Sequence, residues 1–279
     1  MSAPYAKALD ELARQAQGGD RAALEGLLRG LQDQLYRLSL RFLGRAEEAR
    51  DATQEISILV ITQLSTFRGE SSVSTWAYRV ASHHLLRERK QTRKFSFESL
   101  EADLSQPPNA IEPDLLASAE QRLLEEELFL GCTQAMLNSL DVPQRIAFVL
   151  GAVLDLEASE CALVLEISEV AFRKRLSRAR RTLDAFVAKH CGVANPENPC
   201  RCGYQVNYAR SQGRLDPLRF RFAQATDQTS LEALQTFGEI KRVRRSLELY
   251  RAQPIARAPE DFAEHVRAMI ESVRTLSVS

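Results

Sequence analysis

The chain has 279 residues, of which 44% are hydrophobic and 27% charged, and its formal net charge is zero. This composition is ordinary for a globular protein of two or three domains. No apolar run approaches the roughly 20 residues of a membrane span, and the first residues lack the pattern of a secretory signal. We therefore expect a cytoplasmic protein without membrane insertion. The five cysteines are unevenly placed and do not suggest a disulfide framework.

The charges are unevenly distributed along the chain. Cations are concentrated in residues 79–94 and 173–181, whereas acidic residues are concentrated between Glu112 and Glu127. Two basic segments separated by an acidic one predict two distinct binding surfaces. Glycine and proline are scarce, at 12 and 10 residues, and strand alternation is hard to find. We therefore predict an all-α fold.

Residues 1–94 are predicted to form one compact helical domain. Helical patterns cover residues 5–17 and 21–43, the second with Asp20 as its N-cap and Gly44 at its end. The apolar stripes of these helices need one another for burial, which favours a single bundle.

Two further helices of this domain flank a short polar loop. The first ends near Phe67, the loop follows at Arg68-Gly-Glu-Ser-Ser72, and the second helix begins near Ser74 as its N-cap. On the second helix one face combines an aromatic residue with cations: Trp76, Arg79, His83, Arg87 and Lys90. Cations can meet phosphates and a base can stack on the ring, so this face suits a nucleic-acid strand. The alternative is a solvated basic face with Trp76 partly buried in the bundle.

Residues 120–189 are predicted to form a second helical domain. Residues 95–119, which contain three prolines and little periodicity, are predicted to be a flexible or loosely ordered linker before it. A short helix at 158–165, a tight turn and a longer helix at 169–189 match a helix-turn-helix. Helical patterns precede this motif in the same domain, at residues 118–140 and, after the cap Asp141-Val-Pro143, at 145–154.

The last helix of this domain is amphipathic. Its apolar face comprises Phe172, Leu176, Ala179, Leu183 and Phe186. Arginine and lysine crowd the rest of the helix, with no acidic residue between Arg173 and Arg181. The second helix of a helix-turn-helix places its N-terminal residues in the major groove and its flanking cations on phosphates. A basic helix that docks on an acidic protein is the alternative.

Residues 190–279 are predicted to be a helical, cysteine-containing extension with a regulatory role. After His190 the chain is rich in proline, glycine and asparagine and cannot continue as a helix. Helical patterns return at about residues 218–225, 230–250 and 259–276. The last of them has a clear apolar side, which needs a partner for burial.

Four possible metal ligands lie close together in the sequence, namely His190, Cys191, Cys200 and Cys202. Zinc accepts such a set, but the spacing matches no known zinc motif, and an adjacent histidine and cysteine rarely bind one metal together. We therefore predict no metal and keep these four as candidates, with redox sensing or plain thiols as alternatives. Cys132 and Cys161 lie on apolar faces and are predicted to be core residues. The chain has no phosphate loop or catalytic motif, so we predict neither an enzyme nor a cofactor.

Two separated patterns resemble the bacterial extracytoplasmic-function sigma factors. Asp51-Ala-Thr-Gln-Glu55, followed by Phe67-Arg-Gly-Glu70 and Thr75-Trp-Ala-Tyr-Arg-Val-Ala81, is similar to region 2 of that family. The segment from Ile167 to Arg180 is similar to the recognition helix of region 4. The resemblance covers two parts of the chain, residues 5–94 and about 120–189.

The resemblance implies a protein that binds core RNA polymerase, recognises the −35 and −10 promoter elements and promotes DNA melting. An anti-sigma factor is a further candidate partner. The residues implied to face polymerase are Asp51, Gln54 and Glu55. Those implied to contact the −10 element are Arg68, Ser72, Trp76, Arg79, His83, Arg87 and Lys90. Those implied to contact the −35 element are Ser168, Glu169, Phe172, Arg173, Lys174, Arg175, Ser177 and Arg178.

Two other classes of protein remain as alternatives. One is a stand-alone helix-turn-helix regulator that never touches polymerase. The Asp51–Glu55 signature and the helix with Trp76 speak against it, because a reader of duplex DNA needs no second surface for a single strand. The other is a thiol- or zinc-responsive interaction protein in which the cysteine segment does the work.

Overall fold

The computed structural model describes residues 3–88, 96–104 and 119–215, together with positions 247, 249, 250, 253, 256–259, 262 and 268. The regular elements among these residues are all helical, so the predicted all-α fold is confirmed. None of the described helices is long and apolar enough to cross a membrane. The chain divides into two compact units: Met1–Thr92 with Leu156–Phe172 and Ile255–Ser279, and Arg93–Asp155 with Arg173–Pro254.

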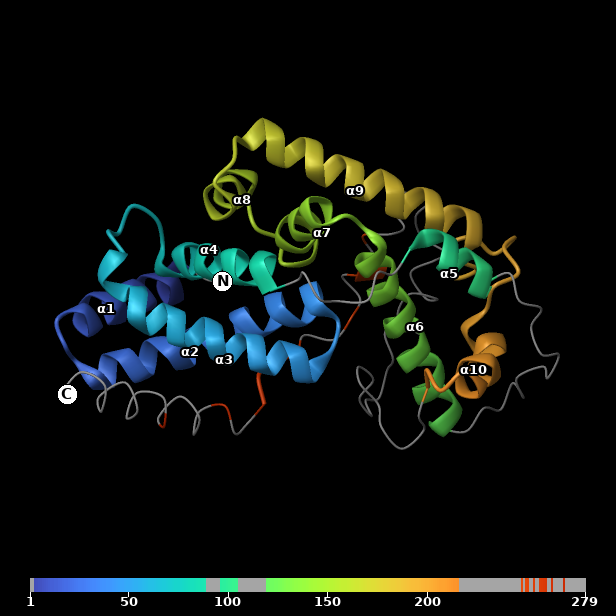
Figure 1. Cartoon of the computed structure of the whole chain (residues 1–279), viewed down its shortest axis with the longest axis horizontal. Coiled ribbons are helices and arrows are strands. Elements are labelled where there is room, and N and C mark those ends of the chain that lie inside the picture. The colour runs from blue at the N-terminus through green and yellow to red at the C-terminus, as the bar shows by residue number, and fades with distance from the viewer. Residues whose placement is uncertain are drawn as a thin grey trace. The chain divides into compact units, whose positions relative to one another are not determined.

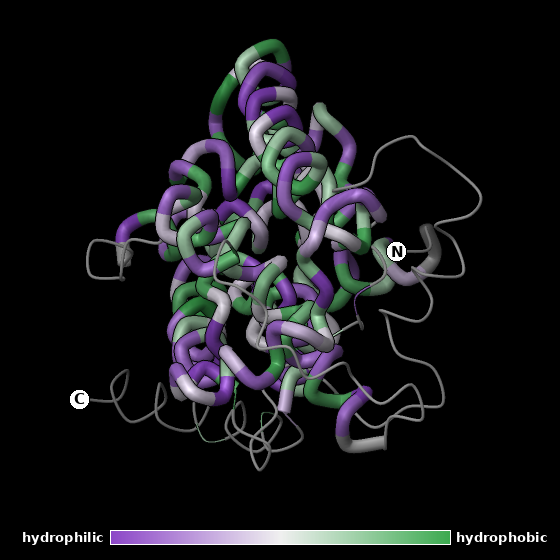
Figure 2. The backbone as a smooth tube through the Cα atoms, turned by 90° about the vertical axis from the view of Figure 1, so that its right-hand side faces the viewer, coloured by the Kyte–Doolittle hydropathy of each residue, from purple (hydrophilic) through white to green (hydrophobic). Residues whose placement is uncertain are grey.

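Unit 1 is built around a bundle of N-terminal helices, drawn in blue to cyan in Figure 1. Its elements are α1 (Ala3–Gln17), α2 (Arg21–Leu43), α3 (Ala46–Gln63), η1 (Leu64–Thr66) and α4 (Val73–Glu88). The central helix α2 packs against α1, α3 and α4. Hydrophilic and hydrophobic residues follow one another at short intervals along the described part of the chain (Figure 2), as helices that bury one apolar stripe require. Leu9, Leu35, Ile56 and Leu85 are among its fully buried side chains.

The ends of the helices show which local signals in the sequence were sufficient to predict where a helix begins or ends. Asp20 caps α2 by accepting a 3.1 Å hydrogen bond from the Ala23 amide, and Gly44 ends it in the left-handed conformation, both as predicted. The start of α4 differs. The Ser72 hydroxyl, not that of Ser74, accepts from the Thr75 amide at 3.1 Å, so the prediction of Ser74 as N-cap is wrong by two residues.

Unit 1 also contains α8 (Ala158–Leu165) and the first turn of α9 (Glu169–His190). A tight turn joins these helices: Glu166 has a φ of 52°, and the Ile167 amide donates to Ala162 O at 3.1 Å. The Ser168 hydroxyl then accepts from the Ala171 amide at 3.2 Å and caps α9. Short helix, turn and long helix reproduce the predicted helix-turn-helix, with α8 at the predicted residues.

Among its described residues, unit 2 holds the remaining part of α9 and five further elements. These are α5 (Phe97–Leu104), α6 (Ala119–Ser139), α7 (Val142–Phe148), the π-helical η3 (Val149–Val153) and α10 (Cys202–Ser211). Asp141 caps α7 as predicted, since its carboxylate accepts from the Gln144 amide at 2.8 Å. Arg145 is almost completely buried, and its guanidinium donates to the carbonyl oxygens of Asn138 and Leu140.

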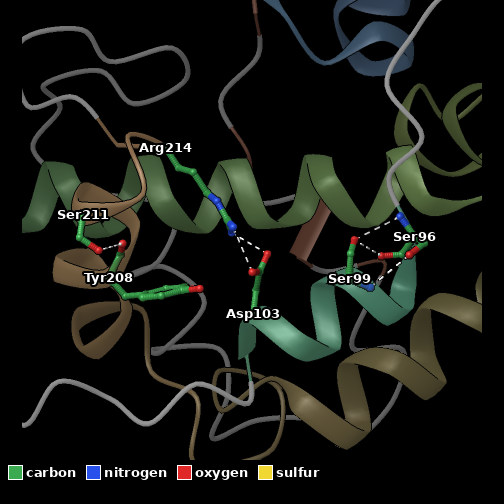
Figure 3. Close-up of polar contacts among 6 residues, drawn as sticks. All are labelled: Ser96, Ser99, Asp103, Tyr208, Ser211 and Arg214. Carbon is green, nitrogen blue, oxygen red and sulfur yellow. Dashed lines mark hydrogen bonds and ion pairs between the residues drawn. The ribbon is translucent and has the colours of Figure 1, made fainter.

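Helix α5 lies inside the segment predicted to be a loosely ordered linker, so that prediction is wrong for residues 97–104. Ser96 and Ser99 cap its start reciprocally: each amide donates to the other hydroxyl, at 3.4 and 3.1 Å (Figure 3). At its other end Asp103 pairs with Arg214 at 2.6 Å. These contacts order α5, although its own apolar pattern is too short to predict a helix.

The C-terminal extension packs against helices of both units. In unit 2, α10 packs on α6 through Leu124, Val206 and Ala209, and the Tyr250 hydroxyl donates to Thr133 O at 2.8 Å. In unit 1, the Ala258 amide donates to Asp33 Oδ1 at 2.9 Å. The helix predicted at 218–225 lies outside the described residues, as do most residues of those at 230–250 and 259–276. The regulatory role of the extension stays a prediction.

Candidate nucleic-acid and polymerase surfaces

The outer side of α3 carries the three residues implied to face polymerase. Asp51 and Glu55 are exposed and lie one helical turn apart, and Gln54 is half-buried. A carboxylate oxygen of Glu55 lies 3.1 Å from Nε2 of His84 on α4. Ile56 on the same helix is fully buried and fixes α3 in the bundle. The two carboxylates are therefore held on the exposed side of a fixed helix. This arrangement suits a partner that presents cationic side chains.

A side chain of α1 holds the polar loop between η1 and α4. The Gln17 side chain donates to Leu64 O at 2.9 Å and to Phe67 O at 2.8 Å. Gly69 turns the chain with a φ of 72°, a conformation that favours glycine. The loop is thereby fixed where it leaves η1.

The first turn of α4 is also fixed from α1. Asp10 Oδ1 accepts a 2.7 Å hydrogen bond from the Val73 amide, so a distant carboxylate caps the helix. Neither Asp10 nor Gln17 is among the site residues predicted from the sequence. No local pattern links them to a loop more than 45 residues away, and only the packing of α1 on α4 brings them there.

A pocket of about 300 Å³ opens where this loop meets α4. Its lining residues are Thr66, Phe67, Arg68, Glu70, Ser71, Thr75, Trp76, Arg79 and Leu163. The rings of Phe67 and Trp76 pack against each other with centroids 5.8 Å apart. Trp76 is only 4% exposed, so its ring is buried in the bundle, as the alternative interpretation of this helix has it. It forms a wall of the pocket, beside the cations Arg68 and Arg79.

The other residues implied to contact the −10 element lie around this pocket or further along α4. Ser72 is half-buried and its hydroxyl lies 2.9 Å from that of Thr75. His83 is half-buried, 3.3 Å from a carboxylate oxygen of Glu166. Arg87 is exposed on the last turn of α4, and Lys90 lies outside the described residues. The structure therefore gathers Arg68, Trp76 and Arg79 in one site and leaves His83 and Arg87 along the helix.

Helix α9 presents a different kind of surface. Ser168, Arg173, Lys174, Ser177 and Arg178 are exposed, whereas Glu169 and Arg175 are half-buried. The ring of Phe172, which is implied to contact DNA, is only 1% exposed, and its contact with DNA stays a prediction. It belongs to the apolar face that is buried together with Ala179 and Leu183. Burial of that face fixes the rotation of the helix and leaves the cations exposed.

Two family models match the chain in the predicted order. Sigma-70 region 2 matches residues 27–95, and Sigma-70, region 4 matches residues 130–183. The first match contains the pocket and the carboxylates of α3, and the second contains the helix-turn-helix. The chain is a sigma factor of the extracytoplasmic-function type, and the predicted family is confirmed.

Curated relatives agree with this assignment. The RNA polymerase sigma-H factor of Pseudomonas aeruginosa is 28% identical over 178 residues, which are 62% of this chain and 91% of the relative. The ECF RNA polymerase sigma factor SigE of Mycolicibacterium smegmatis is 27% identical over 62% of this chain and 65% of the relative. The ECF RNA polymerase sigma-E factor of Escherichia coli is 26% identical over 62% of this chain and 91% of the relative.

Among solved structures, the chain is similar to CnrH in its complex with the cytosolic domain of CnrY. The TM-score is 0.47 at 22% sequence identity, over 64% of this chain and 97% of that chain.

Proposed function

We propose that this sigma factor divides promoter recognition between two surfaces, with α4 and its loop holding the melted −10 strand and α9 reading the −35 duplex. The pocket formed by Arg68, Trp76 and Arg79 is the observation that carries the proposal. A reader of duplex DNA alone has no use for such a pocket, which disfavours a stand-alone regulator. We further propose that the protein acts in the cytoplasm and has no catalytic activity of its own.

The pocket has the size and chemistry to receive a base that has left the stack. Its volume of about 300 Å³ lies at the lower end of the range for small-molecule sites. Removing a base from the duplex costs a few kcal/mol. Contacts with Phe67 and Trp76 and phosphate contacts with Arg68 and Arg79 can offset that cost.

The α9 surface suits duplex DNA because its cations stand on a rigid helix. Lys174 and Arg178 lie one turn apart and are exposed. The buried side chain of Phe172 on the same helix prevents rotation about the helix axis. A helix of this kind enters the major groove, with phosphate contacts that position it and base contacts that give sequence preference.

The third part of the proposal assigns Asp51 and Glu55 of α3 to core RNA polymerase. It predicts that the double variant Asp51→Ala/Glu55→Ala weakens binding of the full chain to core polymerase at least tenfold, a change of about 1.4 kcal/mol. Glu11→Ala, which removes an exposed carboxylate from α1, serves as the matched control and should bind as the unmodified chain does. Binding can be measured by fluorescence anisotropy of the labelled protein at several polymerase concentrations. If the double variant binds as tightly as the control, α3 is not the polymerase-facing surface.

A further inference from the structure

Within unit 1, helix α8 of the helix-turn-helix packs against α4. Thr75 Oγ1 donates to a carboxylate oxygen of Glu160 at 3.3 Å, and Nε2 of His83 lies 3.3 Å from a carboxylate oxygen of Glu166. Between the two glutamates, Leu163 lines the pocket beside α4. Glu160 and Leu163 lie one turn apart on α8, and Glu166 follows at its C-cap. One side of α8 and its C-cap therefore face α4.

The segment that packs on α4 is acidic. Residues 156–172 contain four glutamates and no lysine or arginine. The glutamates are Glu157, Glu160, Glu166 and Glu169. On the other side of the contact, α4 and its loop carry Arg68 and Arg79, the cations that the proposed function assigns to phosphates. Carboxylates of α8 thus lie on a face whose charges suit a nucleic-acid strand.

Helix α8 contributes to the wall of the pocket. Thr75 and Leu163 both line it, and Thr75 is the residue that donates to Glu160. A base that enters the pocket has to compete with Leu163 for space and with Glu160 for the Thr75 hydroxyl.

The contact between α8 and α4 is shallow. Leu163 and Glu166 are exposed, and His83 is half-buried. Exposed ion pairs and single hydrogen bonds stabilise an arrangement only weakly. The contact can therefore form in the free chain and still yield to a partner that binds more strongly.

Binding of a complete promoter is incompatible with this contact. The −35 and −10 elements lie about 25 base pairs apart, or about 85 Å of duplex at about 3.4 Å per base pair. The N-terminal turn of α9, which reads the major groove, begins at Glu169, three residues after Glu166. Three residues of chain span at most about 11 Å. The first turn of α9 therefore cannot read the −35 element while α8 remains on the face that holds the −10 strand.

We propose that α8 covers the −10 pocket in the free chain, and that its release from α4 makes the pocket available to DNA. This role rests on the proposed function, because it takes the pocket as the site of the melted strand. Core polymerase and promoter DNA bind the open form, so both shift the chain toward it. The covered pocket keeps the free chain from binding single-stranded DNA on its own.

The test uses the double variant Glu160→Gln/Glu166→Gln in the full chain. Glutamine keeps the size of both side chains and can still serve the capping box at the start of α8, but it removes the two charges. The matched control is Glu11→Gln/Glu47→Gln, which removes two exposed charges from α1 and α3. Trp76 is the only tryptophan of the chain and lies in the pocket wall. Acrylamide quenching of its fluorescence should therefore increase in the variant and not in the control, a readout that needs no DNA.

The second readout is binding of a fluorescein-labelled single-stranded oligonucleotide with the −10 sequence of a promoter that the holoenzyme uses. The free variant should bind it about fivefold more tightly than the free unmodified chain, because the apparent affinity rises with the fraction of open chains. The free control should bind as the unmodified chain does. Holoenzymes assembled from the variant and from the unmodified chain should bind it equally, since polymerase has already selected the open form.

Three results would overturn the proposal. One is a variant whose Trp76 is quenched no more than in the control. Another is increased quenching without tighter oligonucleotide binding, which would mean that α8 touches α4 without restricting the pocket. The third is an unmodified free chain that binds the oligonucleotide as tightly as its holoenzyme does. Failure of the proposed function has a different signature, namely an Arg79→Ala holoenzyme that binds the oligonucleotide as the unmodified holoenzyme does.

Discussion

Helices α4 and α9 both carry a basic segment, yet they present it in opposite ways. The first half of α4 is buried, including Trp76 at 4% exposure, and its Arg79 lines a pocket together with Arg68 of the preceding loop. In α9 the aromatic Phe172 is buried at 1% exposure, and Lys174 and Arg178 are exposed along the helix. A pocket can hold one base taken out of the stack, whereas an exposed row of cations fits the regular phosphates of a duplex.

A basic, amphipathic helix therefore does not by itself show which form of DNA it binds. What distinguishes the two helices is the support of the first turn. In α4 the local cap Ser72 is joined by Asp10 of another helix, and the turn adjoins a loop anchored by Gln17. In α9 the cap is the local Ser168. The tertiary contacts build a cavity beside α4, and α9 stays a regular helix.

The largest effect is expected from Trp76→Ala, which tests whether α4 is an aromatic-walled pocket or a surface helix. Removing a buried indole should lower the free energy of unfolding by about 3 kcal/mol, because packing and transfer free energy are lost together. Urea denaturation of the full chain, followed by circular dichroism, measures this change. Tyr5→Ala, an aromatic with 45% exposure whose hydroxyl donates to Gly30 O, should cost no more than about 1 kcal/mol. Equal costs for the two variants would mean that Trp76 lies on the surface in solution.

A smaller effect is expected at the helix caps, where Asp10→Ala and Ser168→Ala form a matched pair. Loss of a cap costs about 1 kcal/mol, and more where the acceptor is charged and partly buried. Asp10 accepts at 2.7 Å in a partly buried site, whereas Ser168 accepts at 3.2 Å in an exposed one. Asp10→Ala should therefore lower the free energy of unfolding more than Ser168→Ala in the same urea titration. The reverse order would show that α4 does not depend on α1 for its start.

The smallest effect concerns the far end of α9, where Lys189 pairs with Glu101 of α5 at 2.6 Å. The hydrogen bond from Lys189 lowers the pKa of Glu101 from its ordinary value of 4.5. A lowered carboxyl pKa stabilises the folded state above the unfolded pKa, and this contribution is lost as the pH falls through the folded pKa. The difference in melting temperature between the unmodified chain and Glu101→Gln should thus shrink between about pH 7 and pH 3. Glu98→Gln, on the same helix, serves as the control and should show a smaller change in this difference. A difference in melting temperature for Glu101→Gln that does not depend on pH would contradict the stabilising contact of Glu101 with Lys189.

Sequence patterns predicted the fold class, most helix boundaries and the caps Asp20, Gly44 and Asp141, because those signals are local and of helical period. They failed for α5, because that helix depends on contacts such as the ion pair of Asp103 with Arg214. They also failed for the N-cap of α4, because Ser72 satisfies the local pattern as well as Ser74 does. Asp10 and Gln17 could not be found because their function depends on tertiary packing.

The candidate site shows the same limit. Periodicity placed Trp76 on a helix face with cations, but it could not show that the ring is buried. In α9 the apolar stripe was recognised, and Phe172 was nevertheless included among the DNA contacts.

The most direct test measures each surface on its own ligand, with holoenzyme assembled from core polymerase and the full chain. The ligands are a single-stranded −10 oligonucleotide and a −35 duplex, titrated at several salt concentrations. Arg79→Ala should weaken binding of the oligonucleotide and leave the duplex unchanged. Lys174→Ala/Arg178→Ala should do the reverse and reduce the duplex salt slope by about 0.9 for each lost phosphate contact. If either variant weakens both ligands equally, α4 and α9 do not divide the promoter between them.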